Sequence, residues 1–571
     1  MAEKIADPGA RGPDAGDDAP GLPGDDRAGN HGAASTARPW RRFDRARARR
    51  ILPAAGLWAL AAALLAWSGL AVVSPSYDPM YSLAWGQYLA EGSKPDLHHA
   101  LAPLAHPLPI VFGVLLSPLG PAGAYDAFTM LGAFSFALLG FAAFRLARAL
   151  VGTRELSRVA LGAGVLVLLL LVTRARIDYF ALKATVDIPF AALLLLACSY
   201  VVEDPRARPW LPLALLVPAG LLRPESWLIA AGYCAWLAYD GLRGRRLAIC
   251  AALAAAPVAG WLAFAAIMTG DPLSPITGNP NAENVDVFGF VRPETASASS
   301  YWVSDAREIL DAAVDRTRSM IGDELALLGF ITVLWALLPL IKPENRTPQR
   351  LRLAAVAGFV VLLLVQAMVL AELGAPLSER YVIAPAIILI VLSSVAIWTI
   401  PRREVAIAVS ALVVLLATTG ALSRRTPVWP TLPSVRDRIS QSHDEGIEQE
   451  QLYRLTTLDD VRAAVRPCNK VKIGGRGGIY AVLFAKPLIA HGLDRDPQKV
   501  AAERSPRGKL TASNFRRDLP LGPPPFLQEG VWVFRSPCLR EGYVEGLITR
   551  REGGRGGKPS RAGTKAPPSR E

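Results

Sequence analysis

Charged side chains are scarce in this sequence of 571 residues. Asp, Glu, Lys and Arg together make up 19% of the positions, whereas hydrophobic residues make up 51%. The mean hydropathy is +0.28. Ordinary water-soluble domains carry more charge than this, so the composition argues against a soluble protein and is typical of one that crosses a lipid bilayer.

Other features are missing as well. No clear internal repeat relates the two halves of the chain. The glycine-rich run at 474–478 lacks the spacing of a phosphate-binding loop, and it is interpreted as a flexible turn, with an anion-binding nest as the alternative. The first apolar run starts only at Ile51 and no small-residue cleavage pattern follows it, so we expect no signal peptide and a retained first span.

A nucleic-acid partner is also not expected. The formal net charge is +13, but the arginines lie between hydrophobic runs. This pattern is better explained by the bias that keeps Lys and Arg on the cytoplasmic side of a membrane. We therefore expect membrane lipids, and no nucleic acid, around this chain.

Eleven apolar runs are long enough to cross a bilayer, which takes about 20 helical residues. They lie at about 51–73, 123–144, 157–173, 184–202, 209–222, 225–239, 247–268, 324–341, 352–371, 381–399 and 404–422. The runs 209–222 and 225–239 would form one long run without the segment Arg223-Pro224-Glu225. They are counted as two, because proline breaks or kinks a helix. The predicted fold class is an all-α polytopic membrane bundle with about 11 transmembrane helices.

Basic residues predict the orientation of the bundle. They cluster before the first run, at Arg41, Arg42, Arg45, Arg47, Arg49 and Arg50. They recur in alternate loops, at Arg145, Arg148, Arg154 and Arg158, at Arg206 and Arg208, at Arg243, Arg245 and Arg246, at Lys342, Arg346, Arg350 and Arg352, and at Arg402 and Arg403. The N-terminus is therefore expected in the cytoplasm. Counting 106–119 as a span would invert this pattern, so that segment is interpreted as partly embedded or at the surface.

The spans divide the chain into four parts. We expect a disordered cytoplasmic tail at 1–36, a transmembrane domain at 37–422 with long outer loops at 74–122 and 270–322, an extracytoplasmic region at 423–548, and a disordered basic tail at 549–571. An odd number of spans leaves the region at 423–548 outside the cell.

That outer region is predicted to be a small α/β domain. Its pattern favours helices near 457–465 and 479–486 and strands at 470–473 and 530–535. It also holds Cys468 and Cys538, which are expected to form a disulfide because the outer compartment is oxidising. The remaining cysteines lie in apolar runs and are interpreted as core residues: Cys198, Cys234 and Cys250.

A carboxylate stands a few residues beyond the end of the first span. It is Asp78, in the segment Ser74-Pro75-Ser76-Tyr77-Asp78-Pro79. At a membrane surface, a lipid-linked and a water-borne substrate can both reach such a group, which favours an enzyme with Asp78 as general base. The alternative is that Asp78 caps a helix that begins near Pro79.

The residues around Asp78 carry a family resemblance. The segments are Tyr77-Asp78-Pro79-Met80-Tyr81-Ser82-Leu83-Ala84, Trp85-Gly86-Gln87-Tyr88, Glu91-Gly92-Ser93-Lys94-Pro95 and His106-Pro107-Leu108-Pro109. Together they resemble the first outer loop of the C-type membrane glycosyltransferases, which include protein O-mannosyltransferases, aminoarabinose transferases and mycobacterial arabinosyltransferases. Further similar sites are Leu222-Arg223-Pro224-Glu225, Thr269-Gly270-Asp271-Pro272-Leu273 and Glu379-Arg380-Tyr381. The resemblance covers about 51–400.

This resemblance implies sugar transfer on the outer face of the cell membrane. A sugar on a polyprenyl phosphate would be attacked, with inversion, by a hydroxyl of an envelope glycan, lipid or protein. Asp78 would take the proton, while Arg223, Arg380 and Lys183 would bind the donor phosphate. Candidates for substrate binding are Tyr81, His106, Asp178, Glu225, Glu379 and Tyr381.

Several alternatives stay open at this point. Arg223 and Arg380 could reach lipid headgroups or simply pair with Glu225 and Glu379. The chain could instead be a transporter or flippase of lipid-linked or small solutes, or a scaffold for envelope partners. No cofactor is predicted, although the resembled family has metal-dependent and metal-independent members. A metal site at Asp96, His98, His99 and His106 is considered and not predicted.

Overall fold

A computed structural model describes most of the region that is predicted to lie in the membrane. The described residues are 75, 77–95, 97, 104–152, 157–273, 306–341, 347–372, 379–419, 471–475, 500–502, 530–535 and 544–548. Several predictions fall outside them: the first span at 51–73, both terminal tails, the Cys468–Cys538 disulfide, and the side chains of Asp96, His98 and His99.

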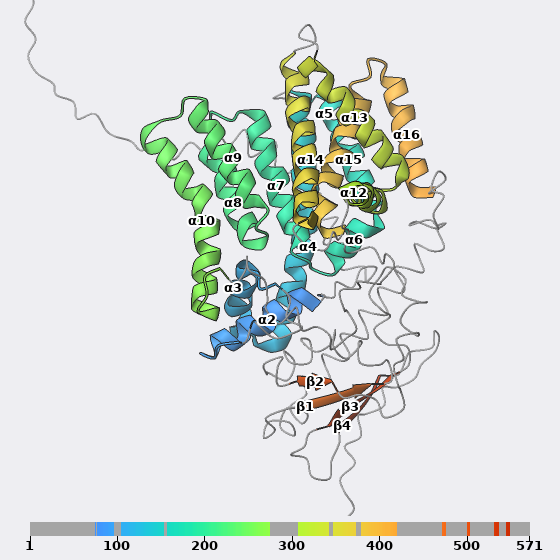
Figure 1. Ribbon diagram of the computed structural model, residues 1–571. Coiled ribbons are helices and arrows are strands. Elements are labelled where there is room, and N and C mark those ends of the chain that lie inside the picture. The colour runs from blue at the N-terminus through green and yellow to red at the C-terminus, as the bar shows by residue number, and fades with distance from the viewer. Residues whose placement is uncertain are drawn as a thin grey trace, which may run out of the picture. The chain divides into compact units, whose positions relative to one another are not determined.

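Helices occupy each predicted apolar run that falls within the described residues. They are α4 (Gly120–Val151), α5 (Arg158–Val172), α7 (Asp187–Glu203), α8 (Trp210–Leu222), α9 (Ser226–Tyr239), α10 (Gly244–Thr269), α13 (Asp323–Ile341), α14 (Pro348–Glu372), α15 (Ile383–Trp398) and α16 (Arg403–Thr419). Figure 1 shows them as long rods that run side by side.

Five segments among the described residues are long and apolar enough to cross a bilayer. They are Gly123–Val151, Gly244–Thr269, Asp323–Ile341, Pro348–Leu370 and Glu379–Trp398. Pro107–Leu119, Arg158–Val172 and Trp210–Leu222 are apolar but shorter. The helices therefore form a multi-pass membrane bundle, and the count of eleven spans stays a prediction.

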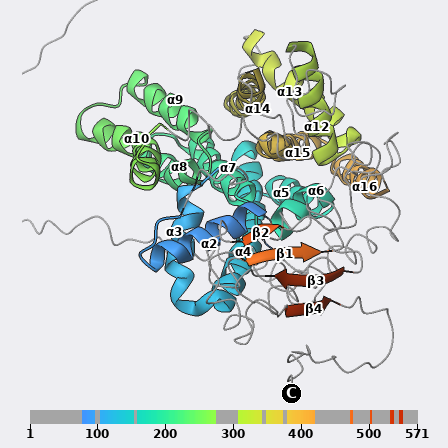
Figure 2. The ribbon, with the colours of Figure 1, turned by 60° about the horizontal axis from the view of Figure 1, so that its bottom comes forward.

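Helix α15 is a central element of the bundle. Fourteen of its 16 residues are buried, and it contacts α4, α5, α7, α13, α14 and α16 (Figure 2). A helix that is apolar on all sides is stable only when other helices surround it. The start of α15 is consequently fixed in the interior of the helix group.

Shorter helices lie between the long ones. They are α2 (Tyr77–Ala90), α3 (Pro107–Leu116), the 3₁₀ turn η2 (Ser117–Leu119), α6 (Ala175–Leu182), α12 (Ala306–Ile321) and η6 (Glu379–Val382). The stretches 74–122 and 270–322, which were predicted as loops, thus contain α2, α3 and α12. At ten residues, α3 is too short to cross a bilayer alone, in agreement with the interpretation of 106–119.

Helices α2 and α3 meet at two glycines. A Cβ atom on Gly86 would lie 2.5 Å from the Cα atom of Gly113, so only glycine allows the two backbones to come this close. Beside this contact, Tyr81 and Trp85 of α2 pack against Ile110 of α3. The pairing fixes α2, which carries Asp78 in its first turn.

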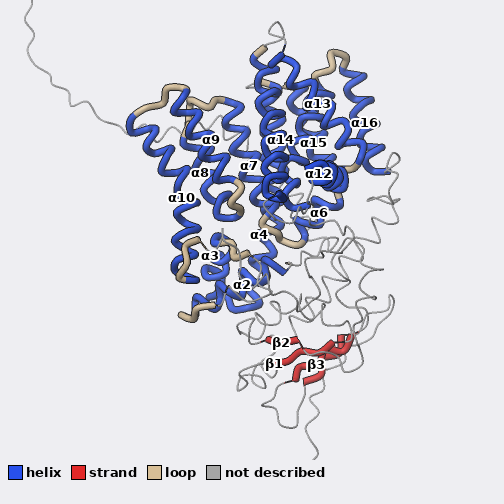
Figure 3. Tube along the Cα trace, in the orientation of Figure 1, coloured by secondary structure: helices blue, strands red, loops and turns tan. Residues whose placement is uncertain are grey.

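The C-terminal region holds a four-stranded sheet in the order β2-β1-β3-β4. Its strands are β1 (Val471–Gly475), β2 (Val500–Ala502), β3 (Gly530–Arg535) and β4 (Val544–Ile548). β1 is parallel to β2 and antiparallel to β3, and β3 is antiparallel to β4. Figure 3 shows strands only in this region among the described residues.

Two of these strands were expected. The structure places β3 at the predicted 530–535, and β1 overlaps the predicted 470–473. No sequence pattern indicated β2, which has three residues, or β4, which contains Gly546. The predicted helices at 457–465 and 479–486 lie outside the described residues.

Candidate functional site

Four elements bring their ends together to form the site. Helix α7 begins at Asp187, α8 ends at Leu222, α9 begins at Ser226, and η6 leads directly into α15. Because these helices succeed one another in alternating directions, the turns at 183–186, 223–225 and 379–382 reach the same end of the helix group. The first turn of α2 reaches it too, since its Asp78 contacts Arg380.

Proline shapes the turn at Arg223. The residue before a proline is pushed out of the helical region into extended backbone. Arg223 accordingly has φ −147° and ψ 128° and ends α8, while Pro224 and Glu225 lead into α9. The predicted break in the apolar run is confirmed, and it leaves Arg223 at a helix end that faces η6.

The turn before Asp187 is tight. Ala184 has φ 50°, a left-handed conformation that residues other than glycine rarely adopt. Thr185 closes the turn by donating hydrogen bonds from its backbone N–H and its Oγ1 to the carbonyl oxygen of Phe180, each 3.2 Å long. This geometry fixes where α7 begins, and with it the position of Asp187.

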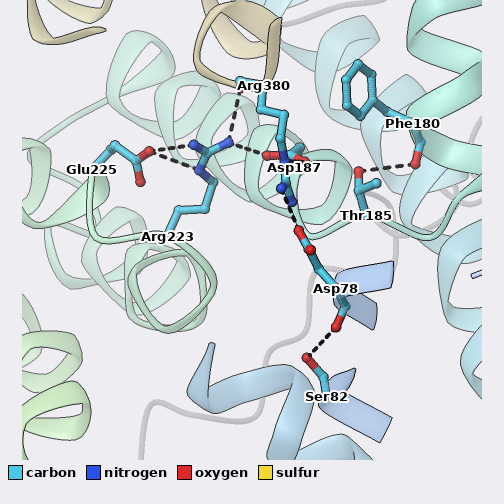
Figure 4. A network of polar contacts seen from close by, with 8 residues as sticks. All are labelled: Asp78, Ser82, Phe180, Thr185, Asp187, Arg223, Glu225 and Arg380. Carbon is cyan, nitrogen blue, oxygen red and sulfur yellow. Dashed lines mark hydrogen bonds and ion pairs between the residues drawn. The ribbon is translucent and has the colours of Figure 1, made fainter. Parts of the chain in front are cut away.

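Two arginines and three carboxylates form one network (Figure 4). Arg380 donates from Nη1 to Oδ2 of Asp78 at 2.5 Å and from Nε to Oδ2 of Asp187 at 2.8 Å. Arg223 donates from Nη1 to Oδ1 of Asp187. It also donates from Nη2 and Nε to Oε1 of Glu225, at 2.6 and 3.0 Å. Asp187 therefore holds both guanidinium groups, one on each carboxylate oxygen.

Burial differs among the members of this network. The side chain of Arg380 is 32% exposed and that of Asp78 is 19% exposed, whereas Arg223 is 8% and Asp187 is 1% exposed. A charge with so little access to water must be paired and hydrogen-bonded. Asp187 is consequently held by its two ion pairs, whereas Asp78 and Arg380 keep part of their side-chain surface accessible.

Arg223 also contacts η6 directly. Its Nη1 donates a 3.1 Å hydrogen bond to the carbonyl oxygen of Arg380, and its guanidinium lies 4.8 Å from the centre of the Tyr381 ring. A guanidinium over an aromatic ring is attracted to the electron-rich face of that ring. Arg223 and Arg380 are therefore held side by side.

A small pocket lies beside the two arginines. Its polar lining comes from Arg223, Glu225, Gln366, Arg380 and Tyr381. Its apolar lining comes from Phe190, Leu363, Ala367, Leu370, Ala384 and Pro385. The pocket thus has a charged side and an apolar wall that is built largely from α14 and α15, two of the candidate membrane spans.

His106 lies in the same electrostatic environment. It directly precedes α3, is 7% exposed, and faces the Trp261 ring edge-on at a centroid distance of 5.8 Å. Burial, followed by the charge of Arg380, lowers the pKa of His106 from 6.5 to about 4. Its Nδ1 atom is buried without a hydrogen-bond partner among the described residues. A neutral imidazole with an unused polar atom can bind a hydroxyl group.

The remaining predicted site residues lie around this network. Lys183 is 5% exposed in the turn before α7, and Asp178 lies in α6 with a side chain outside the description. Tyr81 is 1% exposed, and the centre of its ring lies 5.0 Å from that of Trp85 with the two ring planes tilted. Glu379 contacts Ser319 and Arg176 rather than Arg380. The roles proposed for these side chains stay predictions.

The alternative that each arginine pairs with a neighbouring glutamate is confirmed for Arg223. For Arg380 it names the wrong partner. Arg223 does bind Glu225, but Arg380 binds Asp78 and Asp187 instead of its neighbour Glu379. Asp187 is buried at the start of α7 and binds both arginines, and it was not among the site residues predicted from the sequence. A carboxylate at the start of an apolar helix is a signal that could have found it.

Within the described residues, no group of three or more His, Cys, Asp and Glu side chains is placed to hold a metal ion. Three of the four residues that were considered for a metal site are outside the description.

Comparisons with known proteins give little more. No protein-family model matches this chain. No curated protein matches it either. Among solved structures, the crystal structure of the Archaeoglobus fulgidus oligosaccharyltransferase in the apo form matches with a TM-score of 0.42 and 13% identity. The match covers 73% of this chain and 59% of that one, which is less than two thirds of that protein's length. The family resemblance therefore still rests on the sequence motifs.

Proposed function

We propose that this chain is a membrane glycosyltransferase that moves a sugar from a polyprenyl-phosphate carrier to an acceptor hydroxyl on the outer face of the cell membrane. The observation that carries the proposal is the convergence of Asp78 with Arg223 and Arg380, across the first loop and two distant helix ends. These are the residues that the sequence motifs suggested for proton transfer and for phosphate binding.

The pocket supports a lipid-phosphate donor. Guanidinium groups match the oxygens of a phosphate, and Arg223 and Arg380 line one side of the pocket. Leucine, alanine and proline side chains of α14 and α15 line the other side, which suits a hydrocarbon chain that enters from the bilayer. A soluble nucleotide sugar would have no use for such an apolar wall.

The charges of the network suggest how the base is released. Its carboxylates, Asp78, Asp187 and Glu225, outnumber its two guanidinium groups. An incoming donor phosphate must therefore displace a carboxylate. Asp78 is the less buried of the two aspartates that bind Arg380. Arg380 therefore exchanges its hydrogen bond to Asp78 for one to a phosphate oxygen, and Asp78 becomes free to accept a proton.

The reaction then needs few groups. The oxygen of the acceptor hydroxyl attacks the anomeric carbon of the donor from the face opposite the phosphate. Its proton passes to Asp78, and the bond between the anomeric carbon and the phosphate oxygen breaks with its electron pair going to the phosphate. Arg223 and Arg380 stabilise the charge that develops there. The products are the inverted glycoside and the polyprenyl phosphate.

The test uses the full chain in membrane vesicles that contain a set of radiolabelled polyprenyl-phosphate sugars and an envelope extract as acceptor. Asp78→Asn should reduce sugar transfer about 10²- to 10⁴-fold, the usual contribution of a general base. The control is Asp240→Asn. Asp240 also binds an arginine, Arg206, at 2.7 Å, but it follows the C-terminal end of α9, whereas the site lies at the N-terminal end of that helix.

Full transfer by Asp78→Asn would remove Asp78 from the catalytic role. Movement of the labelled lipid across the bilayer without a new glycosidic bond would contradict the enzyme and favour a flippase. Loss of transfer in Asp240→Asn as well would show that the assay reports folding rather than chemistry.

A further inference from the structure

The short turn η6 carries Arg380 but has little stability of its own. It is a 3₁₀ helix of four residues, Glu379–Val382, and such helices have few and poorly aligned hydrogen bonds. Its position must therefore come from contacts that its side chains make with other elements. The contacts of Glu379 decide how the neighbouring residue Arg380 is presented to Asp78.

The carboxylate of Glu379 contacts residues of two different helices. Ser319 of α12 donates a 2.8 Å hydrogen bond from Oγ to Oε1 of Glu379. Arg176 of α6 places Nη1 at 3.6 Å from Oε2. The Glu379 side chain is 14% exposed, so solvent screens this ion pair only partly. Because each carboxylate oxygen has a different partner, the carboxylate is fixed in orientation as well as in place.

The next residues of η6 continue this attachment. Arg380 binds Asp78 of α2 and Asp187 of α7. Tyr381 packs against an apolar cluster of Ile309, Ala313 and Ala367, which joins α12 to α14. Helix α12 thus holds η6 on both sides of Arg380, through Glu379 before it and through Tyr381 after it.

We propose that Glu379 is a positioning residue for Arg380, and that Ser319 and Arg176 act through it. The inference rests on the proposed function and changes one earlier expectation, because Glu379 then contacts no substrate. Its carboxylate sets the direction of η6, and η6 sets the reach of the Arg380 guanidinium toward Asp78 and toward the donor phosphate. A misplacement of about 1 Å at a reacting group can cost about 100-fold in rate.

The first test measures sugar transfer by the full chain. Glu379→Ala should lower kcat about 100-fold, and Ser319→Ala, which removes one of two contacts, should lower it about tenfold. In the background of Arg380→Ala, Glu379→Ala should cause no further loss, because residues that act as one unit are not additive. The control is Ser410→Ala, at a serine of α16 whose hydroxyl donates to the carbonyl oxygen of Ala406 in the same helix.

An additive loss in the double variant would show that Glu379 has a separate role and would overturn the proposal. Unchanged kcat in both Glu379→Ala and Ser319→Ala would overturn it too. If Glu379→Gln, which still accepts the hydrogen bond from Ser319, restores most of the rate lost in Glu379→Ala, the positioning role is supported.

The second test does not depend on sugar transfer. The coupling between Asp78 and Arg380 is measured from the unfolding midpoints of Asp78→Asn, Arg380→Gln and the double variant, in purified full chain in detergent. The same cycle is repeated in Glu379→Ala. The coupling between Asp78 and Arg380 should be measurable in the wild-type background and absent in the Glu379→Ala background. An undiminished coupling would overturn the proposal, even if the chain proves to have another activity.

Discussion

Arg380 donates a 2.5 Å hydrogen bond to Asp78 across 302 positions of sequence. The donor lies at the entrance to a central helix, and the acceptor lies in the first turn of α2. This pair joins the residue proposed as general base to one proposed to bind phosphate. The consequences for stability, pH dependence and activity can be measured separately.

Removing the charge of Asp187 should strongly destabilise the protein. Asp187→Asn leaves Arg223 and Arg380 without their shared, buried counter-charge. Breaking a buried ion pair in this way costs about 3–5 kcal/mol. The free energy of unfolding of the purified chain in detergent should fall by this order. Asp240→Asn, at an exposed pair, should change it far less, and equal effects of the two substitutions would contradict the central place of Asp187.

His106 should make stability depend on pH. Its pKa is lowered by burial from 6.5 to about 4, so the unfolded chain binds the proton more readily than the folded one. The stabilisation is fully present above pH 6.5 and is lost as the pH falls through 4. The whole effect amounts to about 3 kcal/mol.

The measurement for His106 is the unfolding midpoint at several pH values for the wild type and for His106→Asn, which cannot titrate. The two curves should run parallel above pH 6.5 and diverge below it. Parallel curves over the whole range would show that His106 is not a neutral, buried imidazole.

The close contact between α2 and α3 makes Gly86 sensitive to the smallest side chain. In Gly86→Ala the new Cβ would lie 2.5 Å from backbone atoms of Gly113, so the helices must move apart. We expect about 1–3 kcal/mol of destabilisation and reduced sugar transfer, since α2 carries Asp78. Gly232→Ala is the control, because no atom lies within 4 Å of its added Cβ, and it should leave both quantities nearly unchanged.

Arg223 should not tolerate lysine. Its guanidinium binds Asp187, Glu225 and the carbonyl oxygen of Arg380 together, and one ammonium group cannot reproduce this fork of donors. Arg223→Lys should reduce sugar transfer about 10²- to 10³-fold, by analogy with the loss of one charge-stabilising donor. The matched change Arg206→Lys, at an exposed pair with Asp240, should retain normal transfer. Wild-type rates in Arg223→Lys would mean that charge alone is needed.

The positions of the helices could be predicted because they depend on local information. Each described span follows an apolar run, and the break at Pro224 ends α8 as the sequence indicated. Strand β3 was predicted for the same reason, since Gly530–Arg535 contains an unbroken run of β-branched and aromatic residues. Strand β2 was missed because three residues are too few to show a period.

The site itself was only partly predictable. Motifs pointed to Asp78, Arg223 and Arg380, but the partner of each arginine depends on how four helix ends meet. Asp187 illustrates the limit, because its position at the start of an apolar helix predicts burial and does not say which cations reach it.

The sequence by itself determined that this chain forms apolar helices and that acidic and basic residues stand at their ends, because hydropathy and proline act over a few neighbouring residues. Only the tertiary structure decided that Asp78, Asp187, Arg223 and Arg380 share one network. Their pairing depends on the directions and contacts of several helices packed together, and the free energy of that packing is a property of the whole bundle.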